Sequence, residues 1–287
     1  MDDLTYDLKQ LCHRNRDGGR KTQVQRMQSL KLIAKQLKDA GFDKMHATSL
    51  KGKHVDALVD RWKAENLSAG TIKNRMSHLR FWAQKVGKAG VIPASNAALG
   101  IPQRQSSGAN KAKTLDVEQL DRVNDARVQM SLRLQQAFGL RREESIKFQP
   151  AYADRGDHIA LKGSWCKGGR PRSLPITTAE QRAVLNDAHA LAGSGALIPA
   201  GEKYIRQQNR YDDRCQSAEL SNMHGLRHAY AQARYEVLTG WKSPFAGGPD
   251  RKALTPEQRV IDTAARQQIS HELGHGRIAI VATYIGR

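Results

Sequence analysis

The sequence predicts a mainly α-helical protein with one small β hairpin, organised as two domains. Apolar residues recur at the 3.6-residue helical period through most of the 287 residues. Aromatic residues make up only 6%, which favours aliphatic helix packing over a β sandwich. Residues 94–116 lack this period and are rich in Ser, Gly, Ala, Asn and Gln, as linkers are. We therefore expect a helical domain at 1–107, a basic linker at 108–113 and a second domain at 114–287.

Three predicted helices make up the first domain. Each has apolar residues three or four positions apart, and the first ends at Gly41, a residue type common after helices. They cover residues 22–41, 54–66 and 68–90. In the third, a polar and basic stripe lies beside the apolar one. That stripe fits contacts with phosphates and an ordinary solvated helix face equally well.

The second domain is predicted to combine helices with a hairpin. Short β-like runs flank a Gly-Gly-Arg-Pro turn within residues 158–176, a pattern typical of a small antiparallel sheet. Helical spacing elsewhere predicts helices over residues 115–126, 130–148, 178–192, 224–238 and 256–274.

Charge is the most informative feature of the composition. The chain has 47 Lys and Arg against 28 Asp and Glu, a net charge of +19. Such an excess attracts a polyanion, and nucleic acid is the commonest one, although a generally basic protein is the alternative. No apolar run approaches eighteen residues, and the first twenty residues lack the apolar centre of a signal peptide. Three widely spaced cysteines suggest no disulfide framework, so a cytoplasmic, nucleoid-associated protein is expected.

The segment His271-Glu-Leu-Gly-His275 matches the zinc-peptidase signature HExxH. A zinc peptidase also needs a third protein ligand, usually downstream. The remaining residues after His275 include no His, Glu or Asp. The match is therefore interpreted as coincidental, and neither a metal nor another cofactor is predicted.

A set of polar residues occurs at unusual places in the second domain. Singly, each has an ordinary structural explanation, such as a salt-bridge partner, a turn residue or a helix cap. Together they supply what attack on a DNA phosphodiester by a protein hydroxyl requires: cations for the non-bridging oxygens, a proton donor, a proton acceptor and a nucleophile. In chain order they are Arg141, Lys167, His224, Arg227, His275 and Tyr284.

Four segments around these residues resemble the tyrosine recombinases, the phage-type integrases. "FGLRREES" is similar to the family's Gly-Leu-Arg-x-x-Glu box, and "CKGGRPRSLPI" to its lysine hairpin. "HGLRHAYA" is similar to its His-x-Leu-Arg-His box, and "LGHGRIAIVATY" to its Leu-Gly-His box followed by tyrosine. The match covers residues 115–287, whereas the helical first domain resembles the family's core-binding domain in pattern only. Lys162 lies close to Lys167 and is a competing candidate for the lysine.

The resemblance implies a site-specific recombinase that acts without a metal or ATP. Tyr284 would attack a phosphate and form a 3′-phosphotyrosyl link, with Glu144 in a supporting role. A 5′-hydroxyl of a partner duplex would then reverse the step. The alternatives are a type IB topoisomerase, which would reseal the same strand, and a non-catalytic DNA-binding relative. Integration of a phage or another mobile element is the expected role.

The resemblance also implies partners. One segment of the chain departs from the family's usual pattern. Double-stranded recombination sites held between the two domains, a homotetramer on DNA, and accessory DNA-bending or directionality proteins are expected, with no membrane. The span from Arg227 to His275 is longer than is usual for the family, and residues 239–258 are interpreted as an inserted loop. The cations expected to contact DNA are Lys73, Arg80, Lys88, Arg104, Lys111, Lys113, Arg170 and Arg172.

Overall fold

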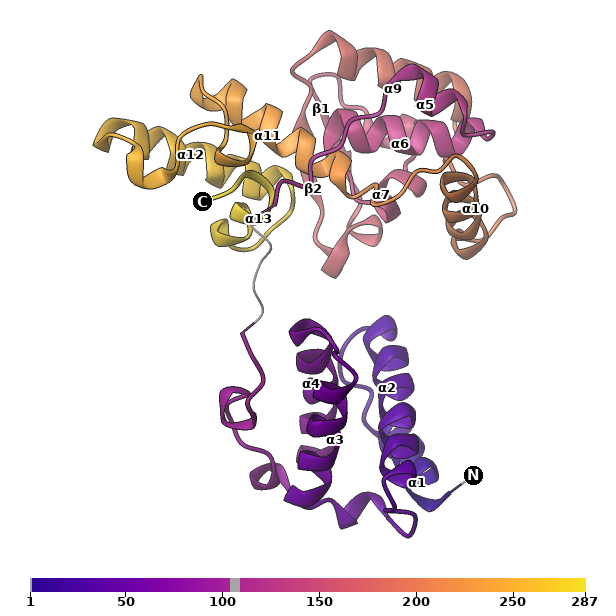
Figure 1. Ribbon diagram of the computed structural model, residues 1–287. Coiled ribbons are helices and arrows are strands. Elements are labelled where there is room, and N and C mark those ends of the chain that lie inside the picture. The colour runs from indigo at the N-terminus through magenta and orange to yellow at the C-terminus, as the bar shows by residue number, and fades with distance from the viewer. Residues whose placement is uncertain (1, 104–108) are drawn as a thin grey trace. The chain divides into compact units, whose positions relative to one another are not determined.

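The structure is a computed structural model that describes residues 2–103 and 109–287. Helices dominate, and the chain divides into two compact units, residues 1–106 and 107–287 (Figure 1). The predicted fold class, mainly α with a small hairpin sheet, is confirmed.

The first unit is a helical domain with four main helices. They are α1 (Asp3–Arg14), α2 (Arg20–Asp39), α3 (Gly52–Ala64) and α4 (Ala69–Lys85). Asp2 and Ser68 begin α1 and α4 by accepting the backbone N–H groups of Thr5 and Thr71. Sequence analysis predicted the last three helices and missed α1. The signals for α1 were the cap at Asp2 and apolar residues four positions apart.

Two buried tryptophans organise the core of the first unit. The indole of Trp62 donates to the Gln36 side chain at 2.9 Å, and that of Trp82 donates to the carbonyl of Ala47 at 2.8 Å. Each large apolar ring therefore enters the core with its polar N–H paired. Apolar residues of all four helices pack around these rings in a single cluster.

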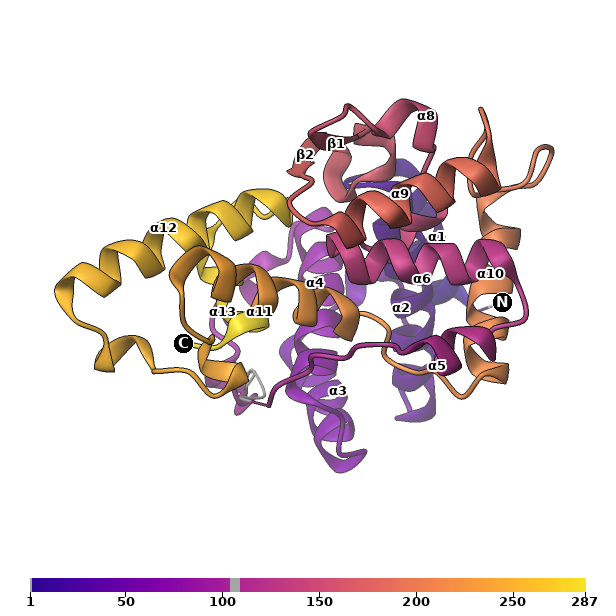
Figure 2. The same ribbon diagram turned by 90° about the horizontal axis from the view of Figure 1, so that it is seen from above.

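The second unit is built around α6 (Ala126–Phe138), which packs against α9 (Ala179–Ala192) and α11 (Gly225–Thr239) (Figure 2). α12 (Pro256–Glu272) lies along α11, and the short α13 (Ala282–Ile285) packs on it as well. The remaining helices are α5 (Val117–Asp121), α7 (Arg142–Ile146), α8 (Pro150–Ala153) and α10 (Tyr204–Ser217). α10 was not predicted from the sequence.

The predicted hairpin is present as an antiparallel pair. β1 (His158–Leu161) pairs with β2 (Arg172–Pro175), and Leu161 lies opposite Arg172. Two 3₁₀ turns, at Gly163–Trp165 and Lys167–Gly169, connect the strands. The connection carries the predicted lysine at its tip.

The stretch predicted as a linker is shared between the two units. Ile101 is buried in the core of the first unit. Asn110 hydrogen-bonds Gln232 of α11, and the N–H of Lys113 donates to the carbonyl of Gly225. The basic segment predicted as linker therefore packs, from residue 110 on, against the second unit. Within the described residues, no helix has both the length and the apolar character needed to cross a membrane.

Candidate active site

Arg141 is held at the joint between α6 and α7. Gly139 ends α6 in the left-handed conformation with φ of 59°, and a Cβ there would lie 2.5 Å from the ring of Tyr230. The chain then turns so that Arg141 precedes α7, and its N–H donates to Glu144 at 2.7 Å. Its guanidinium donates to Glu144 at 2.8 Å and to the carbonyl of Leu273 at 3.0 Å. Glu144 therefore fixes both the backbone and the side chain of Arg141.

Glu144 is fully buried between two arginines. Arg172 of β2 donates two hydrogen bonds to its carboxylate, at 2.8 and 2.6 Å, and a third to the carbonyl of Glu272 at 2.8 Å. Burial alone would raise the pKa of Glu144. The hydrogen bonds and charge of Arg172, with Arg227 and Arg141, outweigh it and lower that pKa to about 2. The carboxylate is thus ionised at neutral pH, and its negative charge offsets the positive charges of the arginines around it.

The prediction that Arg172 contacts DNA is wrong for this structure. Its side chain is 4% exposed, and its donors are engaged with Glu144, Glu272 and the sulfur of Cys166. Arg170 lies in the exposed turn before β2, whereas Arg172 begins the strand on the same buried face as Leu174. The sequence prediction treated the two arginines as one group and therefore missed this difference.

Arg227 is the most deeply buried cation of the site. It lies in the first turn of α11, is 1% exposed, and donates to the carbonyls of Gly139 and Leu273. Burial, followed by the charge of Arg141, lowers the pKa of Arg227 to about 10, so the group stays charged at neutral pH. Because Arg141 donates to the same Leu273 carbonyl, the two guanidinium groups converge at one point.

His275 and Tyr284 meet beside Arg227, whose guanidinium carbon lies 5.7 Å from the centroid of the Tyr284 ring. The Nε2 atom of His275 lies 3.2 Å from the hydroxyl oxygen of Tyr284, whose side chain is 6% exposed. Gly274, with φ of 63°, turns the chain after α12, and the N–H of His275 donates to the carbonyl of Ser270 at 2.8 Å. Burial, then the charges of Arg227 and Arg141, lower the pKa of His275 to about 4. His275 is therefore neutral at physiological pH and able to accept a proton.

His224, which immediately precedes α11, and His228 in its first turns lie beside the tyrosine ring. The ring centroids of His224 and His228 lie 5.9 and 4.6 Å from that of Tyr284. Burial foremost lowers the pKa of both, that of His228 to about 4. His228 was not among the predicted site residues. Its signal was present, since it follows His224 by four positions on the same helix face.

Lys167 lies in the turn between the two strands of the hairpin. Lys167 is exposed and forms no hydrogen bond or ion pair with the described part of the chain. Lys162, the competing candidate, donates to Gln149 at 2.7 Å and lies over the ring of Tyr152, 4.1 Å from its centroid. Lys162 is therefore occupied by packing, whereas the ammonium of Lys167 is free to approach a ligand.

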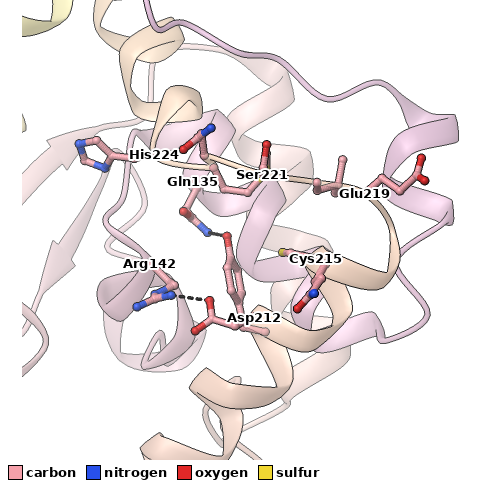
Figure 3. A pocket seen from close by; sticks show the side chains of 12 residues that line it. Gln135, Arg142, Asp212, Cys215, Glu219, Ser221 and His224 are labelled. Atoms are coloured by element: carbon pink, nitrogen blue, oxygen red, sulfur yellow. Dashed lines mark hydrogen bonds and ion pairs between the residues drawn. The ribbon is translucent and has the colours of Figure 1, made fainter. Parts of the chain in front are cut away.

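A cavity of about 630 Å³ opens beside His224. Figure 3 shows it between α7, α10 and the loop that leads to α11, with His224 at its edge. Arg142 and Asp212 form an ion pair of 2.5 Å on its wall, and Gln135 donates to the hydroxyl of Tyr211. His224 is exposed where it lines this cavity.

Two family models match most of the chain. The model described as "Phage integrase, N-terminal" matches residues 1–92, and the model described as "Integrase" matches residues 103–233. The chain belongs to the phage-type integrases, the tyrosine recombinases.

Solved structures of other integrases share the fold. A lambda integrase dimer bound to a COC′ core site aligns with a TM-score of 0.61 at 14% identity, over 96% of this integrase and 76% of the lambda chain. The Tn1549 transposon integrase in complex with circular intermediate DNA gives 0.58 at 11% identity, over 100% and 96% of the two chains. XerH bound to a palindromic difH substrate gives 0.57 at 15% identity, over 98% and 80%. No curated protein matches the chain.

The other cations predicted to contact DNA differ in their surroundings. In the first unit, Arg80 donates to Asn96 at 2.7 Å and Lys88 to the carbonyl of Leu50 at 3.3 Å, so both stabilise the integrase itself. Lys73 on α4 is partly exposed. In the second unit, Lys113 donates to the carbonyl of Ser221, and Lys111 and Arg170 are exposed. Arg104 lies outside the described residues.

The HExxH match has a structural explanation in this integrase. Glu272 is 2% exposed and accepts hydrogen bonds from Arg234 at 3.0 Å and from the hydroxyl of Tyr230 at 2.9 Å. His271 lies exposed on α12. Among residues 2–103 and 109–287, His, Cys, Asp and Glu side chains form no group of three that could hold a metal. The glutamate thus anchors α12 to α11.

Proposed function

We propose that this integrase cleaves and rejoins duplex DNA through a covalent bond between Tyr284 and a 3′-phosphate. The observation that carries the proposal is the approach of the Tyr284 hydroxyl to His275, next to the buried guanidinium group of Arg227. A phenol is a weak nucleophile at neutral pH, so it needs a proton acceptor and a cationic site for the phosphate. Both are present around Tyr284.

In the proposed reaction, the oxygen of Tyr284 forms a bond to phosphorus while the bond from phosphorus to the 5′-oxygen breaks. The tyrosine proton passes to His275, which its lowered pKa leaves free to receive it. Arg141 and Arg227 donate hydrogen bonds to the non-bridging oxygens in place of the Leu273 carbonyl. Lys167 protonates the departing 5′-oxygen. Attack by a 5′-hydroxyl of a partner duplex runs the same steps in reverse.

Assembly on DNA is part of the proposal. The lambda integrase is solved as a dimer on a core site and as a tetramer bound to a Holliday junction. We propose that this integrase likewise assembles as a tetramer on two recombination sites for a phage or other mobile element. A topoisomerase would reseal the cut strand itself, so strand transfer between two labelled duplexes separates the two activities.

A nicked suicide substrate tests the covalent step. Such a DNA loses the short 5′-hydroxyl fragment after cleavage, so the adduct accumulates and is seen on a denaturing gel. Candidate sites are the junctions that flank the encoding element. We expect Tyr284→Phe to abolish the adduct and to keep DNA affinity, because only one hydroxyl is removed. An adduct that persists in the Phe variant would overturn the assignment of the nucleophile.

A further inference from the structure

The inserted segment, residues 239–258, packs against the helix that carries Tyr284. It includes two 3₁₀ turns, Pro244–Ala246 and Arg251–Ala253, and leads into α12. The N–H groups of Ala246 and Gly248 both donate to the carbonyl of Ser243 at 2.9 Å. The first turn is therefore closed on itself and presents a fixed surface.

The first turn packs closely against Gly286. A Cβ on Gly286 would lie 2.8 Å from the Cβ of Pro244 and 3.0 Å from the N of Phe245. Gly286 also has φ of 90° and ψ of 175°, a conformation that residues with a side chain rarely adopt. The chain after α13 thus lies directly on the inserted segment, two residues beyond the nucleophile.

The second turn is connected to Gly286 indirectly, through two side chains of α12. Arg251 approaches the fully buried Asp262 of α12, with Nε 3.4 Å from Oδ2. The other oxygen of Asp262 accepts hydrogen bonds from Arg266 at 2.7 Å and from Tyr235 at 2.8 Å. Arg266 then donates to the carbonyl of Gly286 at 3.0 Å. This chain of ion pairs connects the inserted segment to the backbone after α13.

A third connection fixes the backbone of the nucleophile itself. The amide of Gln232 donates to the carbonyl of Tyr284 at 2.9 Å and to Asn110 at 2.7 Å. Asn110 in turn donates to the carbonyl of Phe245 in the inserted segment at 2.9 Å. All three sets of contacts therefore end at residues 284–286.

We propose that the inserted segment is a positioning element that holds Tyr284 beside His275 of the same subunit, so that cleavage occurs in cis. A helix of four residues such as α13 has too few internal hydrogen bonds to fix its own orientation. Its placement must come from contacts, and the inserted segment adds to those of α11 through the turn Pro244–Ala246. The inference rests on the proposed function, because it concerns how that nucleophile is delivered.

Arg251→Gln, with Lys252→Gln as its matched control, tests the positioning role. Both residues are exposed neighbours and both substitutions remove one positive charge, but only Arg251 contacts Asp262. We expect Arg251→Gln to slow single-turnover cleavage at saturating DNA by about three- to tenfold, since small misplacements of a reacting group are costly. DNA affinity should equal that of the control, and both rates are measured well below the melting temperature of either variant. Arg251→Lys should recover most of the rate.

Hydrogen exchange gives a readout that is independent of catalysis. We expect faster amide exchange at residues 284–286 in Arg251→Gln, and faster still when Pro244 and Phe245 are both replaced by glycine. Wild-type exchange rates in both variants, in the free integrase, would overturn the positioning role. Absence of any adduct from the wild-type integrase would instead overturn the proposed function, so the two failures are distinguishable.

Mixing two inactive variants tests delivery in cis. Tyr284→Phe keeps the arginines, and Arg227→Ala keeps the tyrosine. If the nucleophile acts in its own subunit, their mixture yields no more adduct than either variant alone. If the mixture restores the adduct, the tyrosine is delivered in trans and the inferred role of the inserted segment is wrong.

Discussion

The cations around Tyr284 and those on the surface of the first unit are the same kinds of side chain in opposite situations. Arg227 and Arg172 are buried, and each donates to fixed carbonyl or carboxylate oxygens. Lys73 lies partly exposed on α4. A buried guanidinium is desolvated, so its field at a bound phosphate is strong and its position is set before the phosphate arrives. A surface ammonium acts through a field that water and salt screen.

This difference predicts which substitutions are severe. Removing one partner of a buried charged network leaves the other charges without compensation, whereas removing a surface cation changes only the sum of many weak attractions. Burial therefore predicts a severe loss at Arg227 and a mild one at Lys73, whereas the exposed Lys167 matters through its proposed proton transfer to the leaving oxygen.

Arg227→Ala should cause the largest loss. Its guanidinium points at the Leu273 carbonyl that Arg141 also contacts, where a non-bridging oxygen is proposed to bind. Loss of one such donor typically costs about a hundredfold to a thousandfold in rate. We expect at least that loss in single-turnover cleavage of the suicide substrate, with Arg227→Lys intermediate. A rate within tenfold of wild type would show that burial is not what makes this cation important.

Lys167→Ala should cost nearly as much, but only on ordinary DNA. Loss of a general acid typically costs about a hundredfold to ten-thousandfold, because an alkoxide leaves poorly. A 5′-bridging sulfur leaves as a thiolate and hardly needs the proton, so the variant should recover on a phosphorothiolate substrate. Arg141→Ala should stay slow on both substrates.

Lys162→Ala is the control for this assignment. Its ammonium lies against Tyr152 and Gln149, so the substitution should alter the melting temperature more than the cleavage rate. If sulfur rescues Lys162→Ala and leaves Lys167→Ala slow, the wrong lysine has been assigned. If it rescues neither, His224 becomes the next residue to test as the general acid.

The contrast between buried and exposed cations also shows which features could be predicted from the sequence. Helix periods and short motifs predicted most helices, the hairpin, and His224, Arg227 and His275 around Tyr284, because those signals are local. The partners of each side chain are tertiary and leave no local trace. Arg170 and Arg172 stand two residues apart in one basic motif, yet one is exposed and the other binds Glu144. Likewise, no motif indicates that the inserted segment contacts Gly286.

Acid should destabilise the integrase through two histidines whose pKa values are lowered in the folded chain. The pKa values of His228 and His275 are lowered to about 4 from 6.5, so the unfolded chain binds their protons more readily than the folded one. Stability is therefore full above pH 6.5 and falls as the pH drops toward 4. We expect the free energy of unfolding to decrease by roughly 1–3 kcal/mol over this window.

Substituting one of these histidines should flatten that dependence. His228→Gln removes one group with a lowered pKa, whereas His13→Gln, at an exposed position on α1, serves as the control. Denaturant unfolding at a series of pH values provides the measurement. Equal slopes for both variants would show that burial of His228 does not couple to protonation.

Lys73→Gln should have the smallest effect and should differ in kind from Arg80→Gln on the same helix. If Lys73 contacts one phosphate, its loss removes about one counterion release, so the slope of log affinity against log salt should become shallower by about 0.9. The affinity at low salt should fall by less than about tenfold. Arg80 already donates to Asn96 and to the carbonyl of Pro93, so its loss should lower the melting temperature instead. Fluorescence anisotropy at several salt concentrations, with thermal unfolding of both variants, separates the two outcomes. The slope of log affinity against log salt could instead change more in Arg80→Gln than in Lys73→Gln. That result would reverse these roles and place the DNA-facing side of α4 around Arg80.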